Sequence, residues 1–424
     1  MKHILLPIVL SGLFVVSCGR KDNTIAENKD IKTIKIEVEG CEKNKDISGM
    51  FDTSFFRIIP LETKPECLLG SEIKQVFYRK DRVYIVEEIA KGIFVFDDNG
   101  KFITKIQSYG QGPEEYLSIK AVSITDDKIL ILDGSGRKVL IYDLDCNYLG
   151  QFGIGWKFPA HDMFATNDRI YYVSALNEVK KDVGPYRLCS TDIAGRDFQK
   201  YIPFDPDTVW PCYTGTNGIY TDISDNVKLM YKHTDTVYNA GPDGVHAEYV
   251  IDLGDKALPE YFRTNMGEAR KPENRKKYIN GFLKMLETKD KLIFHFQNGI
   301  IPRLDADKFM AELKKDYKKA MKWYNTEWPT IDYFAFYDKN TGETEVTNGL
   351  SVEWLGMYKV VFQYCDYPYL LFVEESDAQP SKADMENDRL NIPHGSQYEK
   401  RYKEVVTDIK EGDNPIVFVY KLEN

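Results

Sequence analysis

Two neighbouring stretches of the chain repeat the same order of hydrophobic and polar positions. The apolar runs at 82–86, 94–97 and 102 are matched at 128–132, 140–143 and 148, so each match lies 46 positions downstream. The runs are short and are separated by turn-forming residues such as Asp97-Asp98-Asn99-Gly100. A repeat of about 40–50 residues built from short strands is typical of a β-propeller blade. The pattern therefore predicts an all-β fold made of repeated sheets.

The repeat weakens along the chain but can be followed to its end, and it predicts a six-bladed β-propeller with short helical insertions. The predicted strands, blade by blade, are Ile73–Phe77, Arg82–Glu87, Gly92–Phe96 and Phe102–Gln107; Ile119–Ile124, Lys128–Asp133, Lys138–Tyr142 and Tyr148–Phe152; Arg169–Ser174 and Tyr186–Ser190, beginning near His161; Val227–Tyr231, Thr236–Asn239 and Ala247–Leu253; Leu292–Gln297, Tyr333–Tyr337 and Glu345–Thr347; Lys359–Tyr364, Tyr369–Glu374 and Ile416–Leu422. We expect the N-terminal strand, where Ile34, Ile36 and Val38 alternate with charged residues, to complete the last blade. Closing the ring in this way leaves few exposed sheet edges.

Two insertions have the apolar spacing of helices. Residues Asp305–Tyr324 place an apolar residue at every third or fourth position and carry many lysines between them. A second helix is predicted to open at Ser396, because Ser396 and Glu399 form a capping box, and to bury Tyr402 and Val405. A solvated face explains the lysines better than a membrane or an anionic partner does.

The N-terminus predicts export and lipid anchoring. Lys2 is followed by an apolar run from Ile4 to Val16, which is too short for a transmembrane helix and has the form of a signal peptide. The run ends in Val15-Val16-Ser17-Cys18, which resembles the bacterial lipobox, in which the cysteine carries the lipid. We therefore predict a lipoprotein signal peptide over 1–17, a flexible tether over 18–30 and the propeller domain over 31–424.

Composition narrows the function classes. The chain has 424 residues, a formal net charge of −10 and a pI near 5.3, which argues against a nucleic-acid partner. After the N-terminus no stretch approaches about 18 uncharged apolar residues, so no later segment is expected to span a membrane. The expected location is the cell envelope, with the chain attached by its lipid to the outer membrane and facing either the periplasm or the surface. The chain is expected to be monomeric.

Four further segments carry a resemblance to a known family. They are Phe56-Arg57-Ile58-Ile59-Pro60-Leu61-Glu62-Thr63, Gly110-Gln111-Gly112-Pro113-Glu114-Glu115-Tyr116, Asp235-Thr236-Val237-Tyr238 and Asp413-Asn414-Pro415. With these segments in this order, the chain resembles the six-bladed β-propeller lipoproteins of Bacteroidota, relatives of the NHL-repeat and TolB-like propellers. The resemblance implies the fold and the lipid anchor, and it implies no activity, because a fold is not a function.

The residues that could carry chemistry are scattered. The six histidines show no spacing suited to zinc, and no Gly-x-Ser-x-Gly elbow appears. The segment Asp143–Tyr148 begins like a calcium-binding loop, but it has Tyr148 where the sharp turn needs glycine, so we interpret it as a hairpin turn. The cysteines after Cys18 are widely spaced and are expected to be mostly isolated thiols. The five tryptophans are expected to serve packing.

Topology points to one mouth of the propeller channel as a ligand site. If the first strand of each blade lines the channel, the second-to-third turns and the blade-to-blade loops share one face. That face would gather Glu87, Glu88, Gln111, Glu114, Glu115, Tyr116, Asp133 and Arg137. An alternative interpretation is that Gly112-Pro113 fixes the crossover between blades and that Glu115 and Tyr116 hold it in place.

Three functions remain open. The chain could be a non-enzymatic binding module for a glycan, peptide or protein; an enzyme, such as a lactonase-like hydrolase or a lyase; or a TolB-like scaffold for envelope assembly. No cofactor and no catalytic residue are predicted. Because crowded carboxylates repel one another, the acidic mouth would accommodate a divalent cation in the channel, or a cationic or polyhydroxylated ligand.

Overall fold

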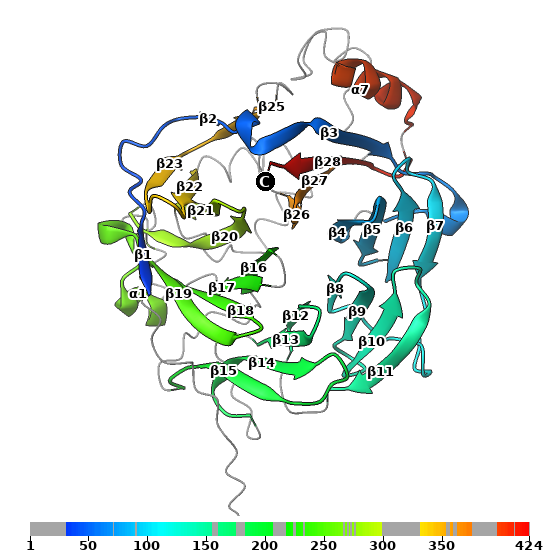
Figure 1. Ribbon diagram of the computed structural model, residues 1–424, viewed down its shortest axis with the longest axis horizontal. Coiled ribbons are helices and arrows are strands. Elements are labelled where there is room, and N and C mark those ends of the chain that lie inside the picture. Colours follow the sequence, from blue (N-terminus) through cyan, green and yellow to red (C-terminus); the bar gives the residue numbers. More distant parts are fainter. Residues whose placement is uncertain are drawn as a thin grey trace, which may run out of the picture.

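The chain folds into a six-bladed β-propeller around a central channel, as the repeat predicts (Figure 1). The computed structural model describes residues 31–423 apart from 71, 90, 155–159, 175–182, 207–217, 224–225, 232–233, 266–267, 269–270, 272–273, 275–276, 299–330, 353–356, 359–362, 375–396 and 411. The signal peptide over 1–17, Cys18, the tether over 18–30, the helix at Asp305–Tyr324 and all five tryptophans lie outside the described residues.

The blades follow one another in chain order, and the strands of each blade are named from the channel outward. They are β4 (Ile73–Arg79), β5 (Arg82–Glu87), β6 (Gly92–Asp97) and β7 (Phe102–Ile106); β8 (Ala121–Ile124), β9 (Lys128–Asp133), β10 (Lys138–Asp143) and β11 (Tyr148–Gly153); β12 (Asp162–Ala165), β13 (Arg169–Val173), β14 (Tyr186–Asp192) and β15 (Gln199–Pro203); β16 (Gly218–Ile223), β17 (Asn226–Tyr231), β18 (Thr236–Gly241) and β19 (Gly244–Asp252); β20 (Ile279–Glu287), β21 (Lys291–Asn298), β22 (Asp332–Asp338) and β23 (Thr344–Thr347); β26 (Tyr364–Asp366), β27 (Tyr369–Glu374), β28 (Ile416–Leu422) and β3 (Phe51–Pro60).

The remaining elements lie outside the six four-stranded blades. A small sheet consists of β2 (Lys45–Asp46), β24 (Leu350–Val352) and β25 (Met357–Tyr358), and β1 (Lys32–Lys35) lies on the outer edge of β19. The described helices are α1 (Glu260–Thr264) and α7 (Gln397–Asp408). Helix α7 confirms the second predicted insertion, and its Tyr402 and Val405 are buried against blade six.

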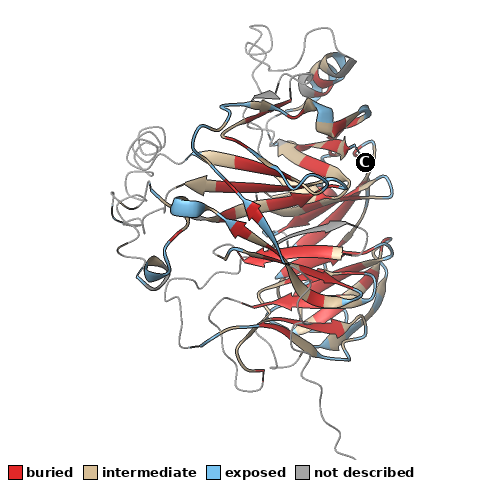
Figure 2. Cartoon of the chain, turned by 60° about the vertical axis from the view of Figure 1, so that its left-hand side comes forward, coloured by how far each residue is buried: buried red, intermediate tan, exposed pale blue. Residues whose placement is uncertain are grey.

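The hydrophobic core lies between the blades rather than in one centre. Strand β5 shows how: Tyr84 and Val86 pack toward blade two, whereas Val83 and Ile85 pack toward blade six. Because both faces of such a strand are buried, its sequence is a continuous apolar run. Figure 2 shows the buried residues concentrated in the strands and the exposed ones at turns and edges. Each blade is thus stabilised mainly by its two neighbours.

The ring is closed by β3, and our expectation for the N-terminal strand was wrong. The segment containing Ile34 forms β1, which pairs in parallel with β19 of blade four. The outer strand of blade six is instead β3, which pairs antiparallel with the C-terminal β28. Residues 31–60 therefore follow the outside of the ring past blades four and five before they close blade six (Figure 1). The alternation that predicted a strand was correct, but it contains no information on which blade that strand joins.

Asn414 joins the two ends of the closing blade. It is 2% exposed, and its side-chain Nδ2 donates to the carbonyl oxygens of Glu62, at 2.7 Å, and Cys67, at 2.9 Å. Its Oδ1 accepts the backbone N–H of Leu69 at 2.9 Å, and its own N–H donates to Thr63 Oγ1. Residue Asn414 therefore joins two distant segments of the chain, around 62–63 and 413–415.

The strand ends that flank the longest connections lie on one face of the ring. We call the side on which the innermost strands begin the long-connection face. The strand ends that flank the connections 174–185, 299–331, 375–415 and 253–278 lie on this face, and much of these connections lies outside the described residues. On the opposite, short-turn face the strands are joined by hairpins such as 80–81, 125–127 and 367–368. Propellers and other scaffolds carry their binding residues on loops of this longer kind.

Candidate functional site in the central channel

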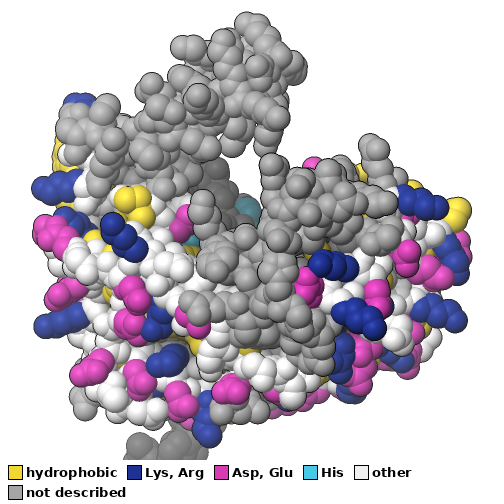
Figure 3. All heavy atoms as spheres, turned by 90° about the horizontal axis from the view of Figure 1, so that it is seen from above, with side chains coloured by type: hydrophobic (Ala, Val, Ile, Leu, Met, Phe, Trp, Pro, Cys, Tyr) yellow, Lys and Arg dark blue, Asp and Glu magenta, His cyan; other side chains and the backbone are white. Residues whose placement is uncertain are grey.

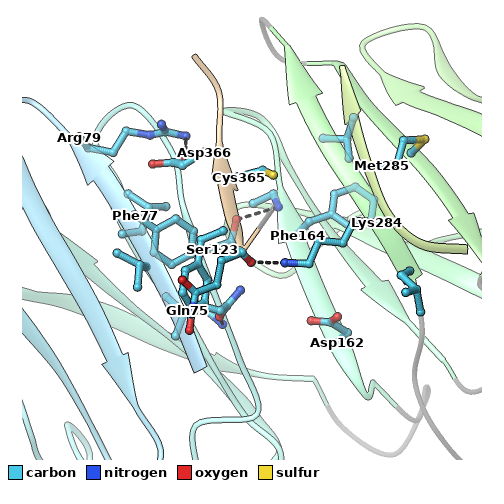
Figure 4. A pocket seen from close by; sticks show the side chains of 18 residues that line it. Gln75, Phe77, Arg79, Ser123, Asp162, Phe164, Lys284, Met285, Cys365 and Asp366 are labelled. Carbon is cyan, nitrogen blue, oxygen red and sulfur yellow. Dashed lines mark hydrogen bonds and ion pairs between the residues drawn. The ribbon is translucent and has the colours of Figure 1, made fainter. Parts of the chain in front are cut away.

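The innermost strands enclose a cavity of about 330 Å³ in the channel. Its walls come from β4, β8, β12, β20 and β26, with Val227 of β17, and Figure 4 shows side chains from opposite sides of the ring pointing into it. Polar and charged residues among its lining are Gln75, Arg79, Ser123, Asp162, Lys284, Gln363 and Asp366. This volume falls at the lower end of the range for small-molecule sites, about 300–1,000 Å³.

Side-chain oxygens in the channel connect one blade to the next. Gln75 Oε1 accepts the N–H of Val122 at 3.3 Å, and Ser123 Oγ accepts the N–H of Ala165 at 3.0 Å. The inner edge strands of separate sheets would otherwise leave these backbone donors without partners. The polar lining is therefore held in place by the fold before any ligand arrives.

Asp366 makes the corresponding contact across the closing blade. Its Oδ2 accepts the N–H of Tyr78 at 2.7 Å, and its Oδ1 forms an ion pair with Arg79 Nη2 at 2.5 Å. Asp366 is 3% exposed. Removing one partner of such a pair would leave a buried charge uncompensated, so this pair orders the junction of blades six and one.

Lys284 is the charge in the cavity that has no counter-charge among the described residues. Its Nζ donates to the backbone oxygen of Gln363 and lies 5.9 Å from the centre of the Tyr364 ring. Burial lowers the pKa of Lys284 below its ordinary value, and Cys365 opposes that shift. Sequence reasoning missed this residue, because a single lysine in an apolar strand has no motif around it.

The cavity adjoins a hollow at each mouth of the channel. On the short-turn face a hollow of about 470 Å³ shares Arg79, Ile124 and Ala165 with the cavity lining. On the long-connection face a hollow of about 340 Å³ shares Gln363 and Tyr364 with it. A small ligand could therefore reach the centre from the face where the long connections lie.

Glu88 is the predicted site residue that lines this second hollow. It is exposed, and its carboxylate lies 3.6 Å from Lys74 Nζ, which also donates to the carbonyl of Ile119. Its neighbour Glu87 is fully buried and lies so close to Gly70 that a Cβ there would stand 2.5 Å from Glu87 Oε1. The two adjacent glutamates thus have different surroundings.

The glycine-rich loop between blades one and two is tied internally. Glu115 Oε2 accepts the N–H of Gly112 at 2.7 Å, and a Cβ on Gly110 would stand 2.0 Å from the same oxygen. Tyr116 is fully buried, and its hydroxyl donates to the carbonyl of Lys91 at 2.6 Å. These contacts agree with the alternative interpretation, in which the loop fixes the crossover between blades.

Asp133 organises the turn on the other side of that crossover. It is fully buried, and its carboxylate accepts the N–H groups of Leu117 at 3.0 Å, Ser118 at 3.1 Å and Gly136 at 2.8 Å. The remaining predicted residues, Gln111, Glu114 and Arg137, are exposed on the loops nearby. Their proposed role in ligand binding stays a prediction.

The other segments and residues considered for chemistry are the calcium-like loop, the cysteines and possible metal ligands. Asp143 Oδ1 accepts the N–H groups of Asp145 and Asn147, which confirms the hairpin turn between β10 and β11. The five described cysteines are free thiols, and burial raises the pKa of Cys146 to about 12. In the described part of the chain no group of three or more His, Cys, Asp and Glu side chains is arranged to hold a metal ion. Nor does any helix there have the length and apolar character to cross a membrane.

Comparisons with known proteins agree on the fold. A family model described as "Domain of unknown function (DUF4934)" matches residues 31–421. No curated protein matches the chain. A structure from Bacteroides fragilis NCTC 9343, named as a candidate exported protein, has a TM-score of 0.63 at 15% identity and covers 93% of this chain and 100% of its own.

Two further solved structures match more weakly. A member of the DUF4221 family from Bacteroides vulgatus has a TM-score of 0.45 at 12% identity, covering 87% of this chain and 97% of its own. A virginiamycin B lyase from Staphylococcus aureus has a TM-score of 0.34 at 12% identity, covering 59% of this chain and 76% of its own. The B. fragilis likeness shows that the propeller architecture is shared over nearly the full length of both chains.

Proposed function

The chain belongs to the DUF4934 family, and we propose that it is an exported, lipid-anchored β-propeller that acts as a non-enzymatic binding module for a glycan, peptide or protein partner. The observation that carries the proposal is the central cavity, whose polar lining is held by contacts between blades and which adjoins a hollow on the long-connection face. Loops on a rigid scaffold are where proteins usually place binding residues.

The lining of the channel also supports binding. Its polar side chains are positioned by contacts with neighbouring blades, so ordering them costs little when a ligand arrives. Figure 3 shows acidic and basic side chains interspersed on the visible edge of the ring. A mixed surface of this kind favours a partner recognised by local contacts over one attracted by a field of a single sign.

Export and anchoring rest on the lipobox-like segment, and the name of the B. fragilis protein is consistent with export. We expect Cys18→Ala to abolish the uptake of labelled palmitate and the partitioning of the protein with membranes, because the thiol that would carry the lipid is gone. Palmitate labelling and membrane fractionation of cells that express either form measure this. A mutant that labels as strongly as the parent would exclude lipid attachment at Cys18.

A thermal-shift screen with oligosaccharides, peptides, calcium, magnesium and zinc tests the binding function. A ligand that binds only the folded state raises the melting temperature as its concentration increases. We expect the hits to weaken in a Glu88→Gln, Glu114→Gln double variant, because both carboxylates are exposed on the long-connection face. Glu343→Gln is the matched control, since Glu343 is exposed in the β22–β23 turn of the short-turn face.

The pattern of hits decides between the alternatives. Ligands that still bind the double variant but no longer bind the control would show binding on the short-turn face, which contradicts the proposal. If no ligand shifts the melting temperature, a scaffold for envelope assembly becomes the better account of the fold.

A further inference from the structure

Three polar side chains that line the central cavity, those of Gln75, Ser123 and Gln363, use their oxygens as acceptors. Gln363 Oε1 accepts the N–H of Val373 at 2.7 Å, as Gln75 Oε1 and Ser123 Oγ accept N–H groups of the neighbouring blades. A backbone N–H can only donate, so it determines which end of each amide is the oxygen. The amide nitrogens of Gln75 and Gln363 must then point away from these contacts.

Donors therefore exceed acceptors in the part of the cavity that these residues line. Among the described residues, neither amide nitrogen has a hydrogen-bond acceptor, and the Ser123 hydroxyl has none for its hydrogen. Lys284 adds an ammonium group, which uses one of its three hydrogens on the Gln363 carbonyl. These donors face the cavity, and hydrogen bonds from them to a charged acceptor are stronger than those to a neutral one.

The charges of the lining leave Lys284 available. Arg79 is neutralised by Asp366 at 2.5 Å. Asp162, the other carboxylate in the lining, accepts the N–H of Met163 at 2.8 Å. No carboxylate among the described residues lies within ion-pair distance of Lys284. A buried ammonium without a counter-charge is unfavourable unless a ligand provides one.

We propose that the central cavity binds the carboxylate group of a small acidic ligand, with Lys284 as the counter-charge and Gln75, Ser123 and Gln363 as hydrogen-bond donors. This inference rests on the proposed binding function and names the ligand chemistry of its channel. It differs from the acidic mouth predicted from sequence, because Lys284 and the amides of Gln75 and Gln363 supply donors at the centre of the channel.

The same geometry predicts an unusual effect on stability. Because burial lowers the pKa of Lys284, the unfolded chain binds more protons than the folded chain between the two pKa values. The penalty for the buried charge is fully present below the folded-state pKa and is relieved as pH rises from there to the unfolded-state pKa. Lys284→Met should therefore raise the melting temperature, and the gain should shrink as pH rises from the folded-state pKa towards the unfolded-state pKa.

The test is a titration of the purified protein with succinate and with glucuronate, followed by calorimetry and thermal shift. Succinamide and glucose are the uncharged counterparts. We expect saturable binding of at least one acid, no binding of its counterpart, and a loss of affinity of about tenfold or more in Lys284→Met, since hydrogen bonds to charged groups are the strong ones. The two acids distinguish a plain carboxylate from an acidic sugar.

Lys200→Met is the matched control. Lys200 also donates to one backbone carbonyl, that of Val183 at 3.3 Å, and also lies over one ring, that of Tyr186 at 4.7 Å, but it sits on β15, outside the channel. It should leave acid binding unchanged. If Lys284→Met does not fold, Gln363→Glu is the second variant. Its carboxylate still accepts the Val373 N–H, and its charge neutralises Lys284, so acid binding should be lost in the same way.

Two results would overturn the inference: no binding of either acid to the parent protein, or equal binding in the parent and in both cavity variants. The titration needs neither the lipid nor the partner. Its failure is therefore distinct from a failure of the anchoring experiment or of the partner screen.

Discussion

A chain that begins at Leu61 is expected not to fold, whereas a chain that begins at Gly40 is expected to fold with reduced stability. The first truncation removes β3, which forms the outer strand of blade six and pairs with β28. Its Phe51, Phe56 and Ile58 pack toward blade five, while Ile59 packs toward blade one. Each such side chain contributes about 1.5–3 kcal/mol on burial. Their sum rivals the total stability of a typical domain, about 5–15 kcal/mol.

The second truncation removes only β1 from the edge of blade four. It loses the buried side chains of Ile34 and Ile36, but it keeps β2, β3 and the closed ring. Circular dichroism during heating, with size-exclusion chromatography of each chain, measures the difference. If the chain that begins at Leu61 unfolds cooperatively near the parental temperature, β3 is not what closes the ring.

Asp133→Asn is expected to destabilise the protein by about 2–4 kcal/mol, because each buried donor left without an acceptor costs about 1–3 kcal/mol. The carboxylate accepts N–H groups of Leu117 and Ser118 on one side of the crossover and of Gly136 on the other. An amide has one oxygen, so either the Leu117 N–H at Oδ2 or the Ser118 and Gly136 N–H groups at Oδ1 would face the new NH₂ group. Urea denaturation of the variant measures the loss.

Glu114→Gln is the control for this substitution. Glu114 lies on the same crossover but is exposed, so its replacement should change stability by less than about 0.5 kcal/mol. Equal stability of Asp133→Asn and the parent would show that the Asp133 contacts are dispensable. Ligand binding, rather than stability, would then be the remaining role for Asp133.

The fold could be predicted from sequence because each blade has a local pattern of short apolar strands separated by turns. Runs such as Val83–Val86 are buried on both faces, and turns such as Asp97–Gly100 separate them at regular intervals. Two innermost strands, β16 and β20, were missed. In β20, Gly281 and Lys284 interrupt the apolar run, and Lys284 lines the channel cavity.

The site was harder to predict, since it is made by contacts between residues far apart in the chain. Gln75, Ser123 and Gln363 belong to three blades and have no local motif. The Gly110–Tyr116 loop, by contrast, has a conspicuous sequence, and its contacts are internal to the crossover. A local pattern reports local geometry, whereas a channel lining is defined by the closure of the ring.

The measurement that tests the central claim most directly is hydrogen–deuterium exchange of the full chain, with and without a saturating ligand from the screen or the acid titration. We predict protection of peptides that cover the beginnings of the innermost strands and the channel wall, namely 73–79, 119–124 and 279–287. Hairpins of the short-turn face that do not line the channel, such as 98–101 and 339–343, should exchange as before. Protection confined to those hairpins or to the outer strands would contradict a ligand site in the channel at the long-connection face.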